Sequence, residues 1–482
     1  MVLSCCRCGP RAASRFVLRS AGIAPLTAPG PAGSPRWAPS LTPGNGILPC
    51  VSRSPQASGS GGRPPWVVGI VGAGQLARML CEAASALDIG TVVLAEELGP
   101  SVPNAGAVLE GSPMSEGDLR GLAGACDVVT FDHEQVDLTA LSILESEGVT
   151  LRPTTATLAM AVDKGSMRRH FAGAGLPVPA FAVLPSGSLG EPLGTSTATT
   201  SATATSSATA VAAVTNFAGA HGWPVILKAT RGGYDGKGVW IAKDVVQARE
   251  ICQEACRAGV PLMVEELVDI EAELAVVVAR RPRGEMVTWP AVETTQVDGV
   301  CREVLYPGRL SPDVAGRAEL LARQVAALCE AVGVMAVELF CTGGDLVVNE
   351  IATRPHNTAH WTIEGAVTSQ FENHLRAVLD LPLGSTDPVA PAVASVNVFG
   401  PSDGTPPGPR LPEALAVEGA HVHLYGKTTR PGRKLGHVTV CGPDGTAVRE
   451  QAWIAATALG TPVPPGIVVP TALLGAVNGV GR

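Results

Sequence analysis

Short apolar runs alternate with helical segments along most of the chain. Residues 67–72 (VVGIVG) form a continuous apolar run, and the apolar positions between Leu76 and Leu87 then recur with a helical period. Another short apolar run, DVVTF, occupies residues 127–131. Such an alternation is typical of parallel strands joined by covering helices. The pattern therefore predicts a doubly wound α/β domain over residues 65–152.

The same alternation resumes at Trp223, continues to about Leu383, and then stops at a stretch rich in proline and glycine. We therefore expect a second domain over residues 153–383 and a smaller, β-rich C-terminal domain over residues 384–482. Within the second domain, residues 186–212 are low in complexity and consist mostly of small side chains. Because such a segment is too small and polar to pack, we expect an inserted surface loop there.

Composition narrows the classes of function. The chain has 482 residues, of which 46% are hydrophobic and 16% are charged, so it can bury several cores in about three domains. Every apolar run is interrupted before the roughly 18 residues that a membrane span needs. A net charge of −8 argues against broad nucleic-acid binding, which requires clustered basic residues. We therefore expect small-molecule ligands, no nucleic acid, no membrane insertion and a cytoplasmic location.

The N-terminal residues 1–64 contain no acidic side chain, since the first one in the chain is Glu82. They are rich in Arg, Ser, Pro, Gly and Ala, and have too few large apolar residues for a core of their own. A dispensable tail is the simplest interpretation. An organelle-targeting segment stays open, because such segments also combine arginine with an absence of acids.

A glycine-rich turn follows the first predicted strand. Residues 72–77 (GAGQLA) satisfy the pattern G-x-G-x-x-G/A, and Glu96 and Glu97 end the next strand, where a ribose-binding acid is expected. These features fit a nicotinamide-dependent dehydrogenase. Such a turn, however, only brings main-chain amides close to an anion at a helix N-terminus, so another phosphate ester fits equally well.

A second glycine-rich run lies between two predicted strands. Residues 231–238 (RGGYDGKG) follow the apolar strand VILK, which ends at Lys228. A flexible basic loop can close over triphosphate oxygens as a lid, with main-chain amides and Lys237 facing the anion. Lys228 at the strand end is a point charge suited to phosphate oxygens. An ordinary glycine-rich hairpin is the alternative.

Acidic residues end the next predicted strand. Residues 264–268 (VEELV) include Glu265, and Glu273 begins a further β-rich run. Such a segment can present main-chain amides to an adenine edge and a carboxylate to ribose hydroxyls. A solvated strand end is the alternative.

Residues 334–350 predict a β-hairpin that brings two carboxylates together. Depending on whether the turn around Gly344 holds two or three residues, Glu338 lies opposite Asn349 or Glu350. Two carboxylates on one apolar ribbon repel each other unless a cation joins them, and oxygen ligands of this kind suit magnesium. Pairing of one glutamate with an arginine is the alternative.

A polar string, RPHNTAHW, follows the hairpin at residues 354–361. It carries more hydrogen-bonding groups than a routine connection needs. The guanidinium of Arg354 offers a fork of donors that can hold a small planar oxyanion such as bicarbonate.

Taken in order, these motifs resemble the N5-carboxyaminoimidazole ribonucleotide synthetase family of the ATP-grasp superfamily. The resemblance rests on GAGQLARM, TFDHEQV, RGGYDGKGVW, the segment from AVELF to RPHNTAHW, and HLYGK with RPGRKLGHVTV, and it spans roughly residues 66–442. It implies an α/β protein with an N-terminal doubly wound α/β domain, a central two-part ATP-grasp α+β domain and a small β-rich C-terminal domain. Two motifs depart slightly from the family, which commonly has GGGQLGRM and APRPHNSGHW.

The resemblance also implies a role for each motif. Residues expected to contact the ribonucleotide substrate are Gly74, Gln75, Leu76, Tyr234, Asp235, Lys427 and Arg433. Those expected to bind ATP are Lys164, Lys228, Lys237, Glu265 and Glu273, and those expected to bind magnesium are Glu338 and Glu350. The groups expected at the reacting atoms are Arg354, His356 and Asn357 for bicarbonate, with Asp235 and Lys427 for the amine.

By this resemblance the chain is a ligase of purine biosynthesis. ATP phosphorylates bicarbonate to carboxyphosphate, and the carboxyl group passes to the amine of 5-aminoimidazole ribonucleotide to give N5-carboxyaminoimidazole ribonucleotide. A homodimer is expected from the family. Two alternatives stay open: an ATP-grasp carboxylase or ligase for a different amine, and a non-catalytic nucleotide-binding sensor.

Overall fold

The computed structural model describes residues 65–96, 104–185, 199–233 and 237–467, and the side chains of residues 199–206 are not described. Residues 1–64, for which a tail or targeting segment is expected, lie outside these ranges.

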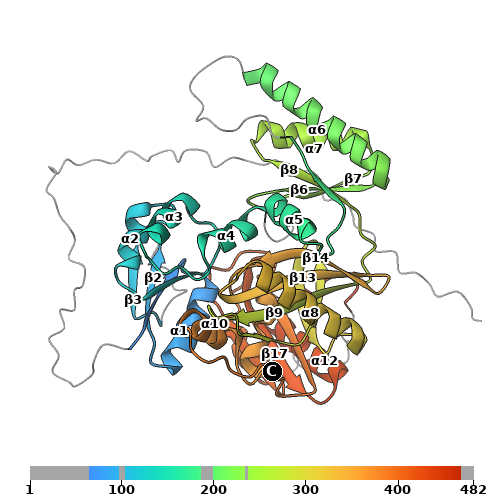
Figure 1. Ribbon diagram of the computed structural model, residues 1–482. Coiled ribbons are helices and arrows are strands. Elements are labelled where there is room, and N and C mark those ends of the chain that lie inside the picture. Colours follow the sequence, from blue (N-terminus) through green and yellow to red (C-terminus); the bar gives the residue numbers. More distant parts are fainter. Residues whose placement is uncertain (1–64, 97–103, 186–198, 234–236, 468–482) are drawn as a thin grey trace, which may run out of the picture. The chain divides into compact units, whose positions relative to one another are not determined.

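The N-terminal domain is a four-stranded parallel sheet with helices on both faces (Figure 1). The strand order is β3-β2-β1-β4. Alternate residues of β1 point to opposite faces, so Val68 and Ile70 pack against α1, whereas Val67 and Val71 pack in the core with α2 and α3. The doubly wound α/β domain is confirmed. Its elements are β1 (Val67–Val71), α1 (Gln75–Ala86), β2 (Gly90–Ala95), β3 (Ala107–Glu110), α2 (Glu116–Ala123), β4 (Val128–Phe131) and α3 (Leu138–Ser146).

The next part of the chain builds a second, smaller sheet. It is antiparallel, with strand order β5-β8-β6-β7, and helices α6 and α7 lie side by side against it (Figure 1). Two short helices precede it and lead in from the N-terminal domain. The elements are α4 (Thr155–Val162), α5 (Lys164–Gly173), β5 (Phe181–Val183), α6 (Thr199–His221), β6 (Val225–Ala229), β7 (Val239–Ala242), α7 (Val245–Arg257) and β8 (Leu262–Glu266).

The expectation of a surface loop over residues 186–212 is wrong from Thr199 onward, because helix α6 begins there. Ala210 and Val214 are buried in the core of the small sheet. Alanine is the strongest helix former, and small side chains at helical spacing let this helix pack closely. The composition was low in complexity, but the apolar stripe that continues to Phe217 was the stronger signal. Residues 186–198 lie outside the described ranges.

A nine-stranded sheet forms the largest layer, with strand order β14-β13-β9-β11-β12-β15-β17-β16 and β10 paired to β9. Its pairs are antiparallel, and helices α8 and α12 pack against it. The strands are β9 (Ala272–Arg280), β10 (Met286–Thr288), β11 (Val292–Val297), β12 (Val300–Tyr306), β13 (Gly333–Thr342), β14 (Asp345–Ala352), β15 (Ala392–Phe399), β16 (Ala420–Leu424) and β17 (Lys434–Gly442). The helices are α8 (Pro312–Leu328), α9 (Thr362–Gly365), α10 (Gln370–Val378), α11 (Leu411–Leu415) and α12 (Gly445–Ala458).

The β-rich C-terminal segment thus extends the sheet of the central domain. Strand β15 pairs with β12, and Glu303 of β12 accepts hydrogen bonds from Arg449 and Trp453 of α12. Since Glu303 is 2% exposed, this ion pair and indole contact fasten α12 to the sheet from inside.

A buried histidine joins the N-terminal domain to the large sheet. The Val334 amide donates to Nδ1 of His374 at 3.0 Å, so the ring proton is on Nε2, which donates to the Thr130 hydroxyl at 2.7 Å. Complete burial lowers the pKa of His374 to about 3, which keeps the ring neutral. The link sets the carboxyl end of β4 beside β13.

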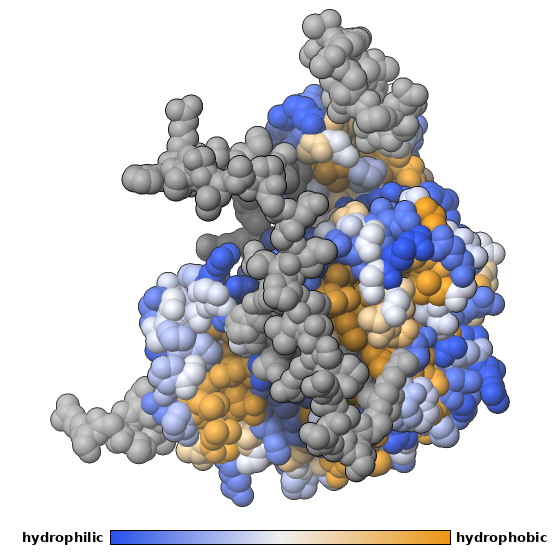
Figure 2. All heavy atoms as spheres, turned by 90° about the vertical axis from the view of Figure 1, so that its left-hand side faces the viewer, coloured by the Kyte–Doolittle hydropathy of each residue, from blue (hydrophilic) through white to orange (hydrophobic). Residues whose placement is uncertain are grey.

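On the face drawn in Figure 2, hydrophobic areas alternate with polar ones, as is normal for a folded surface in water. Within the described ranges, no helix combines the length and the apolar character needed to cross a membrane.

Candidate active site

The β13–β14 hairpin places Glu338 directly opposite Glu350. The turn holds two residues, since Thr342 pairs with Asp345, and this register alone would set Glu338 against Asn349. The register shifts by one residue between Glu338 and Leu339, so Asn349 is the extra residue of a β-bulge. The predicted approach of two carboxylates is therefore confirmed, and its magnesium-binding role stays a prediction.

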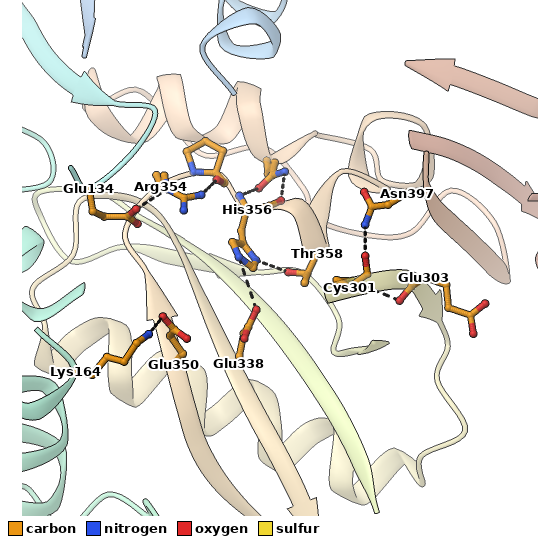
Figure 3. A network of polar contacts seen from close by, with 12 residues as sticks. Glu134, Lys164, Cys301, Glu303, Glu338, Glu350, Arg354, His356, Thr358 and Asn397 are labelled. Atoms are coloured by element: carbon orange, nitrogen blue, oxygen red, sulfur yellow. Dashed lines mark hydrogen bonds and ion pairs between the residues drawn. The ribbon is translucent and has the colours of Figure 1, made fainter. Parts of the chain in front are cut away.

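Two basic or polar groups stand beside this carboxylate pair. Lys164 forms an ion pair with Glu350, and Nε2 of His356 lies 3.7 Å from Oε1 of Glu338 (Figure 3). Lys164 begins α5, and its amide donates to the carbonyl of Thr230 at 2.8 Å, which fixes the helix start to the end of β6. No group of at least three His, Cys, Asp or Glu side chains among the described residues forms a ready metal site. The pair nevertheless fits magnesium, which commonly takes one or two protein carboxylates and completes its shell with phosphate and water oxygens.

Lys228 lies in a buried group of three charges at the end of β6. Its Nζ pairs with Glu265 at 2.6 Å and donates to Oδ1 of Asn349 at 3.2 Å, while Arg168 donates to the other oxygen of Glu265 at 2.6 Å. Burial lowers the pKa of Lys228, and the carboxylate of Glu265 opposes that change. The group has two basic members and one acid, and the charge of Glu350 also acts on Lys228.

This arrangement bears on the expected adenosine contacts. Both carboxylate oxygens of Glu265 are already bonded, and the residue is 2% exposed, so its side chain holds Lys228 in place. Glu273 on β9 is different: burial raises the pKa of its carboxyl to about 7, with Lys228 opposing the shift. Both adenosine assignments stay predictions.

The first glycine turn holds a carboxylate of the protein itself. The amides of Gly74 and Ala77 donate to the two oxygens of Asp132, which follows β4. A Cβ on Gly74 would stand 2.5 Å from Oδ2 of Asp132, so glycine is needed for this approach. Asp132 thus accepts from two of the main-chain amides at the start of α1, where a dinucleotide pyrophosphate would otherwise bind. The dehydrogenase interpretation is therefore disfavoured.

The C-terminal segment reaches the same turn. Nζ of Lys427 donates to Oε1 of Gln75 at 2.5 Å and lies 5.6 Å from the ring centre of Tyr425. The structure thus brings together two residues, 352 positions apart in sequence, that were both assigned to the ribonucleotide. Arg433 is exposed, and its guanidinium donates to the carbonyl of Thr428 at 3.0 Å.

The lid run is described only in part, since Tyr234 and Asp235 lie outside the described residues. At its start, Arg231 pairs with Asp163 at 2.9 Å, and Asp163 also caps α5 through the amide of Ser166. Lys237 is in the turn that precedes β7. The lid assignment of these residues stays a prediction.

Residues 354–357, here the RPHN loop, form a compact loop after β14. Nε of Arg354 pairs with Glu134 at 2.9 Å, and Nδ1 of His356 lies 2.9 Å from the Thr358 hydroxyl (Figure 3). Burial lowers the pKa of His356 to about 3, helped by the charges of Arg354 and Lys434, so the ring is neutral. Oδ1 of Asn357 is buried and has no hydrogen-bond partner among the described residues. Such an orphaned polar atom is a position for a ligand.

Sequence reasoning missed several residues that support this site. Asp132 and Glu134 belong to the TFDHEQV motif, which indicated the family. The motif gave no sign of their partners, which lie far away in sequence. Lys434 was overlooked in favour of its neighbour Arg433, although it is Lys434 whose charge acts on His356. Arg168 carried no signal beyond a basic residue at helical spacing in α5.

Comparisons with known proteins agree with this architecture. The family model for the ribonucleotide synthetase preATP-grasp domain matches residues 66–162, and that for the ATP-grasp domain matches residues 193–371. The model for the phosphoribosylaminoimidazole carboxylase C-terminal domain matches residues 393–451. The three matches, in this order, define an ATP-grasp ligase with the expected three-part fold.

Whole-chain relatives narrow the family. An N5-carboxyaminoimidazole ribonucleotide synthase of Mycobacterium bovis is 42% identical over 398 residues, covering 81% of this chain and 87% of the relative. One of Synechococcus elongatus is 38% identical over 390 residues, covering 80% and 92%. The chain belongs to the N5-carboxyaminoimidazole ribonucleotide synthase family.

Solved structures give the same result. The synthetase of Thermus thermophilus aligns with a TM-score of 0.69 at 34% identity, covering 83% of this chain and 100% of the other. The synthase of Aspergillus clavatus in complex with ADP and 5-aminoimidazole ribonucleotide aligns with a TM-score of 0.70 at 30% identity, covering 82% and 99%. The family resemblance drawn from the sequence is confirmed.

Proposed function

We propose that this ligase carboxylates 5-aminoimidazole ribonucleotide with bicarbonate, using magnesium and ATP, to give N5-carboxyaminoimidazole ribonucleotide, ADP and phosphate. The observation that carries the proposal is the carboxylate pair of Glu338 and Glu350, which stands between Lys164 on one side and His356 on the other. Groups suited to a metal, to phosphate oxygens and to a small oxyanion therefore meet at one hairpin.

Bicarbonate is a weak electrophile, so its carbon must first gain a leaving group. Glu338 and Glu350 would hold a magnesium ion, which would neutralise negative charge on the transferring phosphate. Lys164 and Lys228 would neutralise the phosphate oxygens of ATP, since both side chains end beside the β13–β14 hairpin. A bicarbonate oxygen attacks the γ-phosphorus, the bond to ADP breaks, and carboxyphosphate results.

The RPHN loop is suited to hold bicarbonate during this attack. Arg354 keeps its guanidinium oriented through Glu134, and the buried amide of Asn357 has an open polar atom. Because the pKa of His356 is about 3, its ring is neutral at physiological pH and can exchange hydrogen bonds without adding charge. Arg354 would offer an oxyanion there a charged fork of donors, and Oδ1 of Asn357 could accept from the hydroxyl of bicarbonate.

The acceptor amine is expected to enter from the side of Gln75 and Lys427. These two residues are hydrogen-bonded to each other at 2.5 Å, so they offer a preformed polar surface to the ribonucleotide. The family resemblance adds Gly74, Leu76, Tyr234, Asp235 and Arg433 to the substrate contacts. In this scheme Asp235 accepts the proton that the amine loses as its nitrogen bonds to the carboxyl carbon, and phosphate leaves. A homodimer, expected from the family, and a cytoplasmic location, expected from the sequence, remain predictions.

The test is ADP formation by the full chain with MgATP in carbonate-depleted buffer. Adding bicarbonate and 5-aminoimidazole ribonucleotide together is expected to raise the rate far above either addition alone. ATP cleavage that needs bicarbonate but ignores this ribonucleotide would reassign the acceptor to another amine. ATP binding without cleavage under every condition would favour a nucleotide-binding sensor.

A further inference from the structure

One glutamine side chain holds the main chain of the RPHN loop at two points. Gln370 is the first residue of α10 and is 0% exposed. Its Oε1 accepts a hydrogen bond from the His356 amide at 2.8 Å, and its Nε2 donates to the His356 carbonyl at 2.8 Å. Both polar main-chain groups of His356 are therefore bonded to the same side chain, as they would be in a strand pair.

These bonds fix which way the amide of Gln370 points. Since Oε1 faces an N–H group and Nε2 faces a carbonyl, a flipped amide would set donor against donor and acceptor against acceptor. The second hydrogen of Nε2 points to Nδ1 of His360 at 3.1 Å. His360 must then accept at Nδ1 and carry its proton on Nε2, consistent with a pKa well below 6.5 caused by burial.

The position of Gln370 itself does not depend on the loop side chains. The main-chain N–H of Gln370 donates to the Thr362 hydroxyl at 2.9 Å, and that hydroxyl donates to the carbonyl of Ala359 at 2.6 Å. The hydroxyl of Ser369 caps the helix by accepting from the amide of Glu372. These bonds hold Gln370 at the start of α10, and its side chain in turn holds the main chain of His356.

We propose that Gln370 is a positioning residue of the carboxylation site, which sets the main chain of His356 so that Arg354 and Asn357 converge on one oxyanion. The proposal rests on the bicarbonate role assigned above. Arg354 lies two residues before His356, and Asn357 directly follows it. Rotation about the His356 backbone would therefore move the two side chains apart. Without the two bonds, water would satisfy the same groups and the loop would sample several conformations.

Helix α10 supplies a matched control three residues further on. Asn373 is also 0% exposed, and it makes the same kind of double bond to a main chain, accepting from the Gly384 amide at 2.8 Å and donating to the Gly384 carbonyl at 3.1 Å. Its target, however, is a connection outside the RPHN loop. Asn373 makes two side-chain hydrogen bonds, both to Gly384, whereas Gln370 makes two to His356 and a third to His360. Only the bonds of Gln370 reach the candidate site.

The experiment compares Gln370→Met and Asn373→Leu with the parent protein. In Gln370→Met we expect the bicarbonate concentration for half-maximal ADP formation to rise about tenfold or more, with that for ATP changed less than about twofold. Asn373→Leu is expected to lose stability comparably while both half-saturation values stay near those of the parent. Parent-like bicarbonate dependence in a folded Gln370→Met protein would overturn the proposal.

A second variant gives a signature that a purely structural role would lack. A buried glutamate at this position ionises reluctantly, and when protonated it can accept from the His356 amide and donate to its carbonyl, which restores both bonds. The activity of Gln370→Glu relative to the parent should therefore rise as the pH is lowered from about 8.5 to about 6.5, whereas the ratio for Gln370→Met stays flat. A flat ratio for both variants contradicts the proposal, even if Gln370→Met proves too unstable to assay.

Amide hydrogen exchange separates this inference from the proposed function. Exchange in the peptide covering residues 354–361 should speed up in Gln370→Met and not in Asn373→Leu. If the parent shows no bicarbonate-dependent turnover, the proposed function fails, and the exchange result alone decides whether Gln370 orders the loop. Unchanged exchange in Gln370→Met would show that Gln370 does not order the loop, whatever the activity.

Discussion

Glu338 faces Glu350 across the β13–β14 hairpin because Asn349 is bulged out of the ladder. The bulge has two effects at once. It moves Glu350 one position along the strand, into register with Glu338, and it frees the side chain of Asn349 to accept from Nζ of Lys228 at 3.2 Å. One β-bulge therefore places both the Glu338–Glu350 carboxylate pair and the side chain that contacts Lys228.

Removing one carboxylate of the pair tests its chemical role. Glu350→Ala is expected to lower turnover by at least about a hundredfold, because phosphoryl transfer needs the cation that we propose this pair to hold. Steady-state ADP formation measures the effect, and Asp345→Ala at the exposed end of the same hairpin is the control that should keep its activity. Near-parental turnover in Glu350→Ala would exclude the metal assignment.

A double-mutant cycle tests the bond between Lys427 and Gln75. Lys427→Met and Gln75→Leu are each expected to raise the half-saturating concentration of 5-aminoimidazole ribonucleotide about tenfold, since each removes a charge-assisted hydrogen bond. Because both remove the same bond, the double variant should show far less than the product of the two effects. Arg433→Gln combined with Gln75→Leu should be additive, because Arg433 bonds to Thr428 instead. Additivity in the first pair would mean that the two residues bind the substrate independently.

The buried charges around Glu265 make a strong prediction about stability. Arg168→Met leaves Glu265 with one partner fewer in a site where Arg168 is 1% exposed, so we expect the free energy of unfolding to fall by about 3–5 kcal/mol. Chemical denaturation measures the loss. Arg120→Gln, which breaks the exposed pair with Glu147, should change stability little. A small loss in Arg168→Met would show that the buried pair is not well formed.

The pH dependence of stability reports the environment of Glu273. Burial raises the pKa of its carboxyl to about 7 from an ordinary value of 4.5, so the folded chain holds this proton more tightly than the unfolded chain does. The contribution of Glu273 to stability is therefore most favourable below pH 4.5 and is lost as the pH rises through about 7. Glu273→Gln removes that loss, so its melting temperature minus that of the parent should increase from pH 4.5 to pH 7 and then level off. A constant difference would place Glu273 in a solvated environment.

The parts of the fold that the sequence predicts are those set by local pattern. The run VVGIVG and the helical period after it gave the doubly wound domain, because apolar periodicity alone determines which faces must be buried. The same rule was set aside for residues 199–212, where composition was weighed above the spacing of Ala210 and Val214, and the helix was missed.

The parts that could not be predicted are contacts between distant segments. The sequence placed Glu338 near position 350, but no local pattern marks the bulge at Asn349, whose side chain meets Lys228 from 121 positions away. The partnership of Glu134 with Arg354 joins residues 220 positions apart, and no pattern in either motif indicates it. Side chains that position others, such as Gln370, stay hidden for the same reason.

Isotope labels in bicarbonate can show whether this chain activates bicarbonate with ATP and transfers its carboxyl group to 5-aminoimidazole ribonucleotide. The most direct measurement supplies the full chain with MgATP, this ribonucleotide and bicarbonate labelled with carbon-13 and oxygen-18, and follows both labels. We expect carbon-13 in the N5-carboxyl group of the product and one oxygen-18 in the released phosphate, since the bicarbonate oxygen that attacks phosphorus leaves with it. Product that carries the carbon label beside phosphate free of oxygen-18 would contradict activation through carboxyphosphate, and absence of the carboxylated ribonucleotide would contradict the claim itself.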